Sequence, residues 1–191
     1  MPGMEILTQM ELRRRYEEII QQIRKGALFI HPTDTIYGIG CNALNSQSVQ
    51  NVRTLKEQFR QPLSIWVPSL EWVRQNCMVN TEAAVWLQKL PGPYTIILKL
   101  KNKKAVAPEV LLNGNTLGIR LPDHWFSKVV KKIGLPIVTT SANKTGQQFM
   151  TTLETLDKSI ENGVEFMIYE GEKSAHPSKI INTVEGSVKE R

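Results

Sequence analysis

The chain has 191 residues, a formal net charge of +6 and a hydrophobic content of 41%, which suits one globular domain with a single substantial core. No apolar run reaches the roughly 18 residues of a membrane span, and the start of the chain lacks the apolar stretch of a secretory signal. The scattered cysteines and histidines indicate neither zinc nor a disulfide framework. We therefore expect a cytoplasmic protein with no membrane partner and no metal held by the protein, whose basic surface favours anions.

Helical and strand patterns alternate along the chain. Helices are predicted over 9–25 with Gly26 as its terminating glycine, from an N-cap at Ser46, from Ser69, over 81–90, over 125–133 with Asp123 as its cap, and over 152–162. Strands are predicted over 27–30, 63–67, 94–100, 118–121, 137–140, 166–169 and 180–184. This order predicts an α/β fold with a mixed sheet flanked by helices, because 94–121 holds strands with no helix between them. Ligands of such sheets collect at the carboxyl ends of strands.

The first candidate segment for a working cleft is HPTDTIYGIG at residues 31–40, directly after a predicted strand. Threonines flank Asp34, and Gly38 and Gly40 allow another group to approach the backbone closely. Small hydroxyls and backbone amides at a strand end suit a polar ligand. An ordinary turn in which Asp34 bonds its own backbone explains the same pattern.

The second candidate segment is TTSANKTG at residues 139–146, which also follows a predicted strand. A hydroxyl-rich turn of this kind can bind phosphate through its side-chain and backbone donors, or it can satisfy its own hydrogen bonds. A third feature is GIRLPDH, which places Arg120 inside an apolar strand. Its guanidinium needs a carboxylate or phosphate partner, supplied either by a ligand or by an internal salt bridge. The chain has no P-loop, GxGxxG or GxSxG motif.

Five motifs occur in a fixed order: HPTDTIYGIG, LKEQFRQPLSI, LPGPYT, GIRLPDH and PIVTTSANKTG. Their order and spacing resemble the YrdC-like family, the threonylcarbamoyl-AMP synthases of tRNA modification, from about Ala27 to the end of the chain. The resemblance implies a twisted, mixed, open α/β sheet flanked by helices, with a basic concave face. It also implies a single YrdC-like domain over residues 1–191, in which the helix within 1–26 takes part and no C-terminal extension follows.

The activity that this resemblance implies is that of an L-threonylcarbamoyladenylate synthase, a nucleotidyltransferase. Such an enzyme condenses L-threonine, bicarbonate or CO2 and ATP into threonylcarbamoyl-AMP and pyrophosphate, for the N6-threonylcarbamoyladenosine (t6A) modification of tRNA. The implied cofactor is Mg2+ bound with ATP. The implied partner is a threonylcarbamoyl transferase that uses the product, and tRNA is a further candidate.

The resemblance also assigns roles by motif position. Threonine is expected on Thr35, Arg120 and Ser178, with its carboxylate on Arg120, and on the backbone of Thr139. The nucleotide and its phosphates are expected on Lys56, Thr116, Ser141 and Asn143. Lys56 and Ser141 are the residues expected to stabilise developing charge, so we class them as catalytic. By residue type, Asp34 and His124 are candidate proton acceptors.

The chain departs from the family pattern around the loop after Lys56. Gln58 stands where the family's K-x-R pair has arginine, and the loop before Pro62 is one residue short; Arg60 is the candidate for the missing guanidinium. Gln61 matches a position that touches ATP, and Arg191 aligns with an arginine that reaches ATP in longer relatives. Trp66 either packs in the core or helps to hold threonine.

An alternative reading is a YrdC-like RNA-binding module without synthase activity, which would use the same basic face. A steep salt dependence of RNA binding, without threonine-dependent pyrophosphate release, would favour that module. The related domain of hydrogenase-maturation carbamoyltransferases is set aside, because that enzyme needs zinc-finger-like and acylphosphatase modules.

Overall fold

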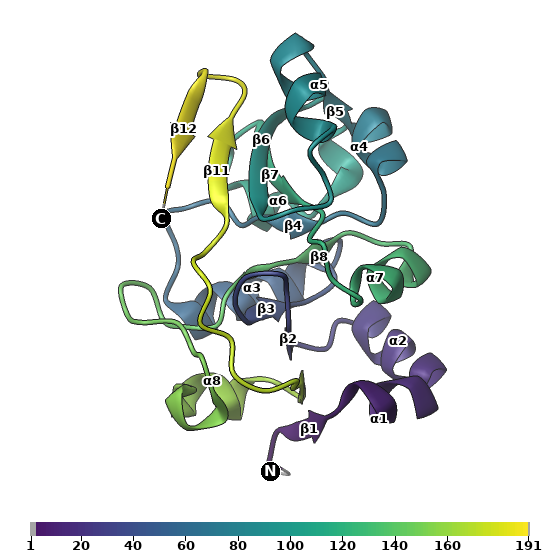
Figure 1. Cartoon of the computed structure of the whole chain (residues 1–191), viewed down its shortest axis with the longest axis vertical. Helices are drawn as coiled ribbons and strands as arrows, with labels where there is room; N and C mark the ends of the chain where they lie inside the picture. Colours follow the sequence, from purple (N-terminus) through teal and green to yellow (C-terminus); the bar gives the residue numbers. More distant parts are fainter. Residues whose placement is uncertain (1–2, 191) are drawn as a thin grey trace.

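The strands divide between two sheets in the computed structural model, which describes residues 3–190 (Figure 1). The first sheet has the order β1-β10-β2-β3-β9, and its members are β1 (Glu5–Leu7), β2 (Phe29–His31), β3 (Gly38–Gly40), β9 (Thr140–Ser141) and β10 (Phe166–Ile168). The second has the order β12-β11-β6-β7-β4-β8, with β5 also paired to β6. Its members are β4 (Ile65–Trp66), β5 (Cys77–Met78), β6 (Tyr94–Leu100), β7 (Thr116–Arg120), β8 (Ile137–Val138), β11 (Lys179–Asn182) and β12 (Ser187–Lys189). Both sheets mix parallel and antiparallel pairs.

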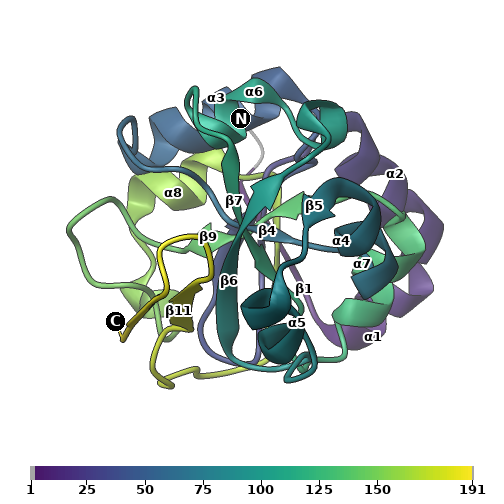
Figure 2. The same ribbon diagram turned by 90° about the horizontal axis from the view of Figure 1, so that it is seen from above.

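Helices surround the central strands when the molecule is seen from above (Figure 2). They are α1 (Gln9–Arg14), α2 (Tyr16–Lys25), α3 (Ser46–Lys56), α4 (Leu70–Asn76), α5 (Thr81–Leu87), α6 (Pro108–Leu111), α7 (Ser127–Ile133) and α8 (Lys158–Gly163), with short 3-10 turns at Lys103–Ala105 and Leu153–Thr155. Within residues 3–190, none of these helices has the length and apolar character that a transmembrane span needs. The α/β class with mixed strand pairing and flanking helices is therefore confirmed, although the strands form two sheets and not the one sheet that the sequence predicted.

The two sheets are joined by the segment that contains the second candidate motif. β8 pairs with β4 in the second sheet, whereas β9 pairs with β3 in the first. Thr139 lies between them, and its amide donates to the Ser64 carbonyl at 2.9 Å. The hydroxyl-rich segment thus crosses from one sheet to the other, at the place where the strands diverge.

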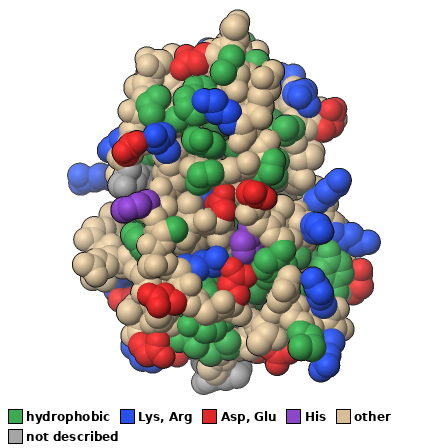
Figure 3. All heavy atoms as spheres, viewed as in Figure 1, with side chains coloured by type: hydrophobic (Ala, Val, Ile, Leu, Met, Phe, Trp, Pro, Cys, Tyr) green, Lys and Arg blue, Asp and Glu red, His purple; other side chains and the backbone are tan. Residues whose placement is uncertain are grey.

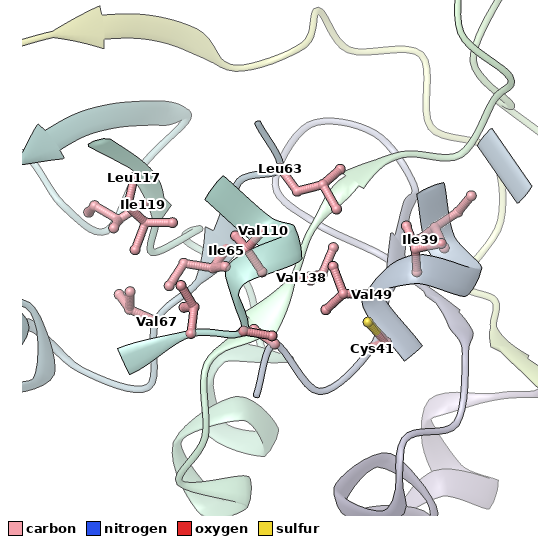
Figure 4. Close-up of a cluster of buried hydrophobic side chains, with 14 of the residues drawn as sticks. Ile39, Cys41, Val49, Leu63, Ile65, Val67, Val110, Leu117, Ile119 and Val138 are labelled. Carbon is pink, nitrogen blue, oxygen red and sulfur yellow. The ribbon is translucent and has the colours of Figure 1, made fainter. Parts of the chain in front are cut away.

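Two clusters of buried apolar side chains hold this arrangement. In the larger one, residues of the second sheet such as Ile65 and Ile119 share a core with Ile39 of β3 and Val49 of α3 (Figure 4). In the other, Ile19 and Ile23 of α2 pack with Val130 of α7. The first cluster spans both sheets, so burial of apolar surface fixes the position of one sheet against the other.

Several predicted boundaries are wrong for local reasons. The helix predicted over 9–25 is broken at Arg15, which leaves helical geometry (φ −107°, ψ 27°) and forms ion pairs with Glu5 and Glu18. The region 152–162 contains a 3-10 turn and then α8, because the Asp157 side chain accepts from the amides of Ser159 and Ile160 and starts a new helix.

The two predicted N-caps are also wrong. Asn45 caps α3 in place of Ser46, and α7 begins only at Ser127, with no side-chain cap. The amide of Asp123 instead donates to the Asp34 carboxylate at 3.0 Å. Strands β1, β3, β5 and β12 were not predicted. Each has only two or three residues, and the sequence around it was not recognised as an apolar run of strand length.

Candidate active site

A cleft of about 430 Å³ opens between the second sheet and the loop that follows β9. Its lining residues are Lys56, Gln58, Gln61, Pro62, Leu63, Ser64, Thr95, Ile97, Thr116, Gly118, Thr139, Thr140, Ser141, Asn143, Thr145, Gly146, Ile180 and Lys189. A narrow recess adjoins the cleft, shares Ser64, Thr95 and residues 139–141 with it, and adds Arg120 and Ser178. Cleft and recess thus share part of their wall, and we call the two together the cavity, with the cleft as its wide end and the recess as its narrow end.

The narrow end is built around Arg120, at the end of β7. This side chain is almost fully buried, and its Nη2 donates to Asp34 Oδ1 at 3.1 Å and to Thr35 Oγ1 at 3.2 Å. The other Asp34 oxygen accepts from the Asp123 amide at 3.0 Å. The internal salt bridge that the sequence left open is thus present, and it orients a guanidinium that also lines the recess.

Hydroxyl groups surround the recess and are themselves held in place. Ser178 Oγ lies 2.7 Å from Thr95 Oγ1, and Thr35 Oγ1 lies 3.0 Å from Thr33 Oγ1. The Thr33 hydroxyl also accepts from the amides of Thr35 and Ile36, so this part of the first segment satisfies its own turn. The buried hydroxyl of Thr139 has no hydrogen-bond partner within residues 3–190, which leaves it able to bond a ligand in the cavity.

The wide end is built around Lys56, the last residue of α3. Glu57 adopts left-handed geometry (φ 54°) and ends the helix, and the buried Lys56 ammonium donates to the backbone carbonyls of Ser141 and Asn143. The amide and hydroxyl of Thr145 contact the Lys56 carbonyl at 2.9 and 3.0 Å. These bonds tie the second candidate segment to the end of α3 and hold the lysine at the cleft wall.

The loop after Lys56 is held by an arginine that the sequence analysis did not single out. The buried guanidinium of Arg53 donates to the carbonyls of Gln58 and Gln61 at 2.8 and 2.9 Å, and to those of Glu109 and Val110 at 2.7 and 3.3 Å. Gln58 and Gln61 both line the cleft. The signal for Arg53 was its position on the buried stripe of α3, next to Val49 and Val52.

One predicted nucleotide residue, Arg60, does not line this cavity, and another lies outside the described residues. Arg60 is exposed on the loop and is not among the residues that line the cleft, so its role stays a prediction. Arg191 lies outside the described residues. The remaining predicted site residues are together: Lys56, Gln61, Thr116, Ser141 and Asn143 line the wide end, Thr139 lines both ends, and Arg120, Ser178 and the neighbouring Thr35 form the narrow end.

Gly38 and Gly40 lie against the buried side chain of His31. A Cβ atom on either residue would lie 2.9 Å from the imidazole ring of His31. That ring stacks on Phe126 with centroids 5.6 Å apart, and burial lowers the pKa of His31 to about 3. His31 is therefore a neutral core histidine, and the glycines make room for its ring.

The two candidate proton acceptors are both engaged. Asp34 bonds Arg120 and the Asp123 amide, as described above. His124 Nδ1 accepts from the Phe126 amide at 3.2 Å, and its Nε2 lies 2.9 Å from Glu170 Oε1. Trp66 is fully buried within the cluster that contains Phe126, which agrees with the alternative that Trp66 packs in the core.

The charges at the cleft favour an anion. Among residues 3–190, its lining includes two lysines, Lys56 and Lys189, and no carboxylate. Within residues 3–190 no group of three or more His, Cys, Asp or Glu side chains could hold a metal ion. On the face in Figure 3, acidic and basic side chains are interspersed, although blue Lys and Arg side chains gather at the right-hand edge, over α2 and α7. The basic concave face stays a prediction.

Comparison with known proteins identifies the family. The model of the Sua5/YciO/YrdC family, described as "Telomere recombination", matches residues 21–189. The chain belongs to this family. A protein of Methanocaldococcus jannaschii, provisionally named a threonylcarbamoyl-AMP synthase, is 36% identical over 179 residues, which cover 92% of this chain and 83% of that protein. The threonylcarbamoyl-AMP synthase of Idiomarina loihiensis is 26% identical over 171 residues, covering 86% of this chain and 91% of that protein.

Solved structures of family members share the fold. The Pyrococcus abyssi Sua5 structure, complexed with L-threonine, superimposes with a TM-score of 0.84 at 25% identity over 98% of this chain. This chain spans only 56% of that longer protein. Escherichia coli YciO superimposes with a TM-score of 0.81 at 21% identity, covering 95% of this chain and 90% of that one.

Proposed function

We propose that this Sua5/YciO/YrdC family member is an L-threonylcarbamoyladenylate synthase. The observation that carries the proposal is the single cavity, which has a buried guanidinium with hydroxyl groups at its narrow end and a lysine with hydroxyl groups at its wide end. An amino acid and a nucleoside triphosphate would meet inside it. The synthase names of the relatives favour this enzyme over an RNA-binding module without activity.

L-Threonine occupies the narrow end in this proposal. The Arg120 guanidinium binds its carboxylate, since the planar group matches a carboxylate and Asp34 already fixes its orientation. The hydroxyls of Thr35 and Ser178 and the backbone of Thr139 complete the contacts. A buried site of fixed hydroxyls discriminates against amino acids that lack a hydroxyl, because those would leave its polar groups unpaired.

ATP occupies the wide end. Lys56, Thr116, Ser141, Asn143 and Gln61 line it, and its lysine charge with amide and hydroxyl donors suits phosphate oxygens. The Oδ1 atom of Asn143 is buried and has no hydrogen-bond partner within the described residues, so it can accept from the nucleotide. Arg60 and Arg191 are the further cations that we expect to approach the nucleotide.

Mg2+ enters with ATP. The described residues at the cleft offer hydroxyl and amide oxygens and no carboxylate, a donor set that fits an ion held mainly by phosphate oxygens and water. When bound, this ion neutralises phosphate charge.

The reaction needs no nucleophile from the protein. The nitrogen of the neutral threonine amine bonds to the carbon of CO2 and releases a proton to solvent, which gives a carbamate. A carbamate oxygen then bonds to the α-phosphorus of ATP, and the bond from that phosphorus to the pyrophosphate oxygen breaks. The chain's task is to align the two substrates and to stabilise charge on the phosphates, which we assign to Lys56 and Ser141. The product, threonylcarbamoyl-AMP, passes to a threonylcarbamoyl transferase for t6A formation on tRNA, and tRNA itself is a candidate partner.

The test is an incubation of the protein with ATP, Mg2+, L-threonine and bicarbonate, followed by measurement of pyrophosphate and detection of the adenylate by mass spectrometry. We expect both products, and neither when threonine is left out. If neither product forms while a family member of known activity works in parallel, the proposal is wrong.

A further inference from the structure

A carboxylate outside the cavity receives three side-chain contacts. Glu170 follows β10, and its Oε1 lies 2.9 Å from His124 Nε2 and 2.6 Å from Lys173 Nζ. Its Oε2 accepts from Trp125 Nε1 at 2.7 Å. Because His124 Nδ1 accepts from a backbone amide, Nε2 of the neutral ring carries the proton and donates it to Glu170. Glu170 is not among the residues that line the cleft or the recess.

The segments that supply the threonine contacts converge on this carboxylate. His124 and Trp125 lie a few residues after Arg120 in the chain. Glu170 itself begins the strap, by which we mean residues 170–178, and the strap ends at Ser178 in the recess. Two partners of the proposed substrate are therefore connected through one acidic group.

The strap also holds the segment that carries Thr35. Lys173 Nζ, which pairs with Glu170, donates to the Thr33 carbonyl at 2.9 Å. The Tyr37 hydroxyl donates to the Gly171 carbonyl at 2.7 Å and accepts from the Glu170 amide at 3.0 Å. Thr35, the third expected partner of the substrate, therefore lies in a segment that is also held by Glu170 and the strap.

The charge on Glu170 is strongly favoured in this setting. Burial by itself would raise the pKa of its carboxyl, but the hydrogen bonds from His124, Lys173 and Trp125 outweigh burial and lower that pKa to about 2. A carboxylate that accepts from three donors is a rigid junction, because each donor limits the positions that the others can take.

We propose that Glu170 is a positioning residue for the amino acid subsite. It holds the strap and the segment after β7 in the arrangement in which Ser178, Thr35 and Arg120 face one substrate. This inference rests on the proposed function. Glu170 should affect only one end of the cavity, because the strap contacts the narrow end, whereas the wide end is held by Lys56 and Arg53.

The test compares Glu170→Gln with the control Glu161→Gln, which removes a surface ion pair to Lys158 on α8. The new amide group presents N–H atoms to donors that need an acceptor. We expect the KM for threonine to rise at least tenfold in Glu170→Gln, with the KM for ATP within twofold of the wild type, and no change in Glu161→Gln. Glu170→Asp, which keeps the charge, should recover part of the loss.

A milder variant covers the case in which Glu170→Gln fails to fold. Trp125→Phe removes one donor and keeps an aromatic ring, so it should raise the KM for threonine by a smaller factor. An unchanged KM for threonine, or an equal rise in both KM values, in whichever of these variants folds would overturn the role of Glu170. A wild-type protein that makes no adenylate would refute the synthase assignment and this inference with it, whereas an active wild type with unaltered variants would refute only the inference.

Discussion

Arg120 offers the sharpest test of how substrate recognition and stability are coupled. In Arg120→Gln the proposed contact to the threonine carboxylate loses its charge. Hydrogen bonds to charged groups contribute about 1.5–3 kcal/mol each, so the loss of two such bonds should cost roughly 3–6 kcal/mol. Since each 1.4 kcal/mol or so is a factor of ten, the KM for threonine should rise at least a hundredfold. The KM for ATP should change little.

The same substitution should also destabilise the fold. The Asp34 side chain is only 10% exposed, and removing Arg120 leaves its charge buried without its cationic partner. Breaking a buried pair in this way costs about 3–5 kcal/mol. The double variant Arg120→Gln/Asp34→Asn removes the charge as well, so it should regain most of that stability without regaining threonine affinity.

Urea unfolding and threonine titrations at saturating ATP measure these two effects separately. If the double variant regains threonine affinity together with stability, Arg120 acts only through the fold. If Arg120→Gln keeps the wild-type KM for threonine, the guanidinium does not bind the substrate.

Three further substitutions test other parts of the structure. Lys56→Met should lower kcat by about a hundredfold with little change in the KM for threonine, measured by pyrophosphate release. An equal effect on kcat and on the KM for threonine would contradict the role of Lys56 in stabilising charge. Arg53→Lys removes the planar guanidinium that donates to the carbonyls of Gln58 and Gln61 in the loop after Lys56. The KM for ATP should therefore rise several-fold, while the KM for threonine stays constant. His31, with its pKa of about 3 in the folded protein, binds a proton more readily when unfolded. Its contribution to the free energy of unfolding should therefore fall by about 1.4 kcal/mol per pH unit between pH 6.5 and about pH 3. His31→Phe should abolish this share of the acid loss, measured by urea unfolding at pH 7 and pH 4.5.

The elements that could be predicted from the sequence are those with a strong local period. The helix face of Ile19, Ile20 and Ile23 and the strand from Tyr94 have such patterns, and both are present. The short strand β3 could not be predicted. It pairs with residues 29–31 on one side and with residues 140–141 on the other, and such pairing is decided by the whole fold.

The candidate site was predictable where residue chemistry is unusual for its position. Arg120 in an apolar strand and the hydroxyl-rich turn at 139–146 both indicated the cavity, and both line it. Glu170 could not be found in this way. Its importance lies in contacts to segments distant in the chain, and a single acidic residue in the sequence carries no sign of such contacts. Arg53 could have been singled out by its place on the buried stripe of α3, but the carbonyl groups that it holds are brought to it only by the fold.

The most direct test of the central claim is to follow the carbon of bicarbonate. The protein is incubated with 13C-bicarbonate, ATP, Mg2+ and L-threonine, and the adenylate is analysed by mass spectrometry. If one cavity joins the amino acid to the nucleotide through a carbamate, the product is threonylcarbamoyl-AMP, heavier by one mass unit than with unlabelled bicarbonate, and it disappears when threonine is omitted. Formation of AMP and pyrophosphate without threonine, and with no label in any adenylate, would contradict the account.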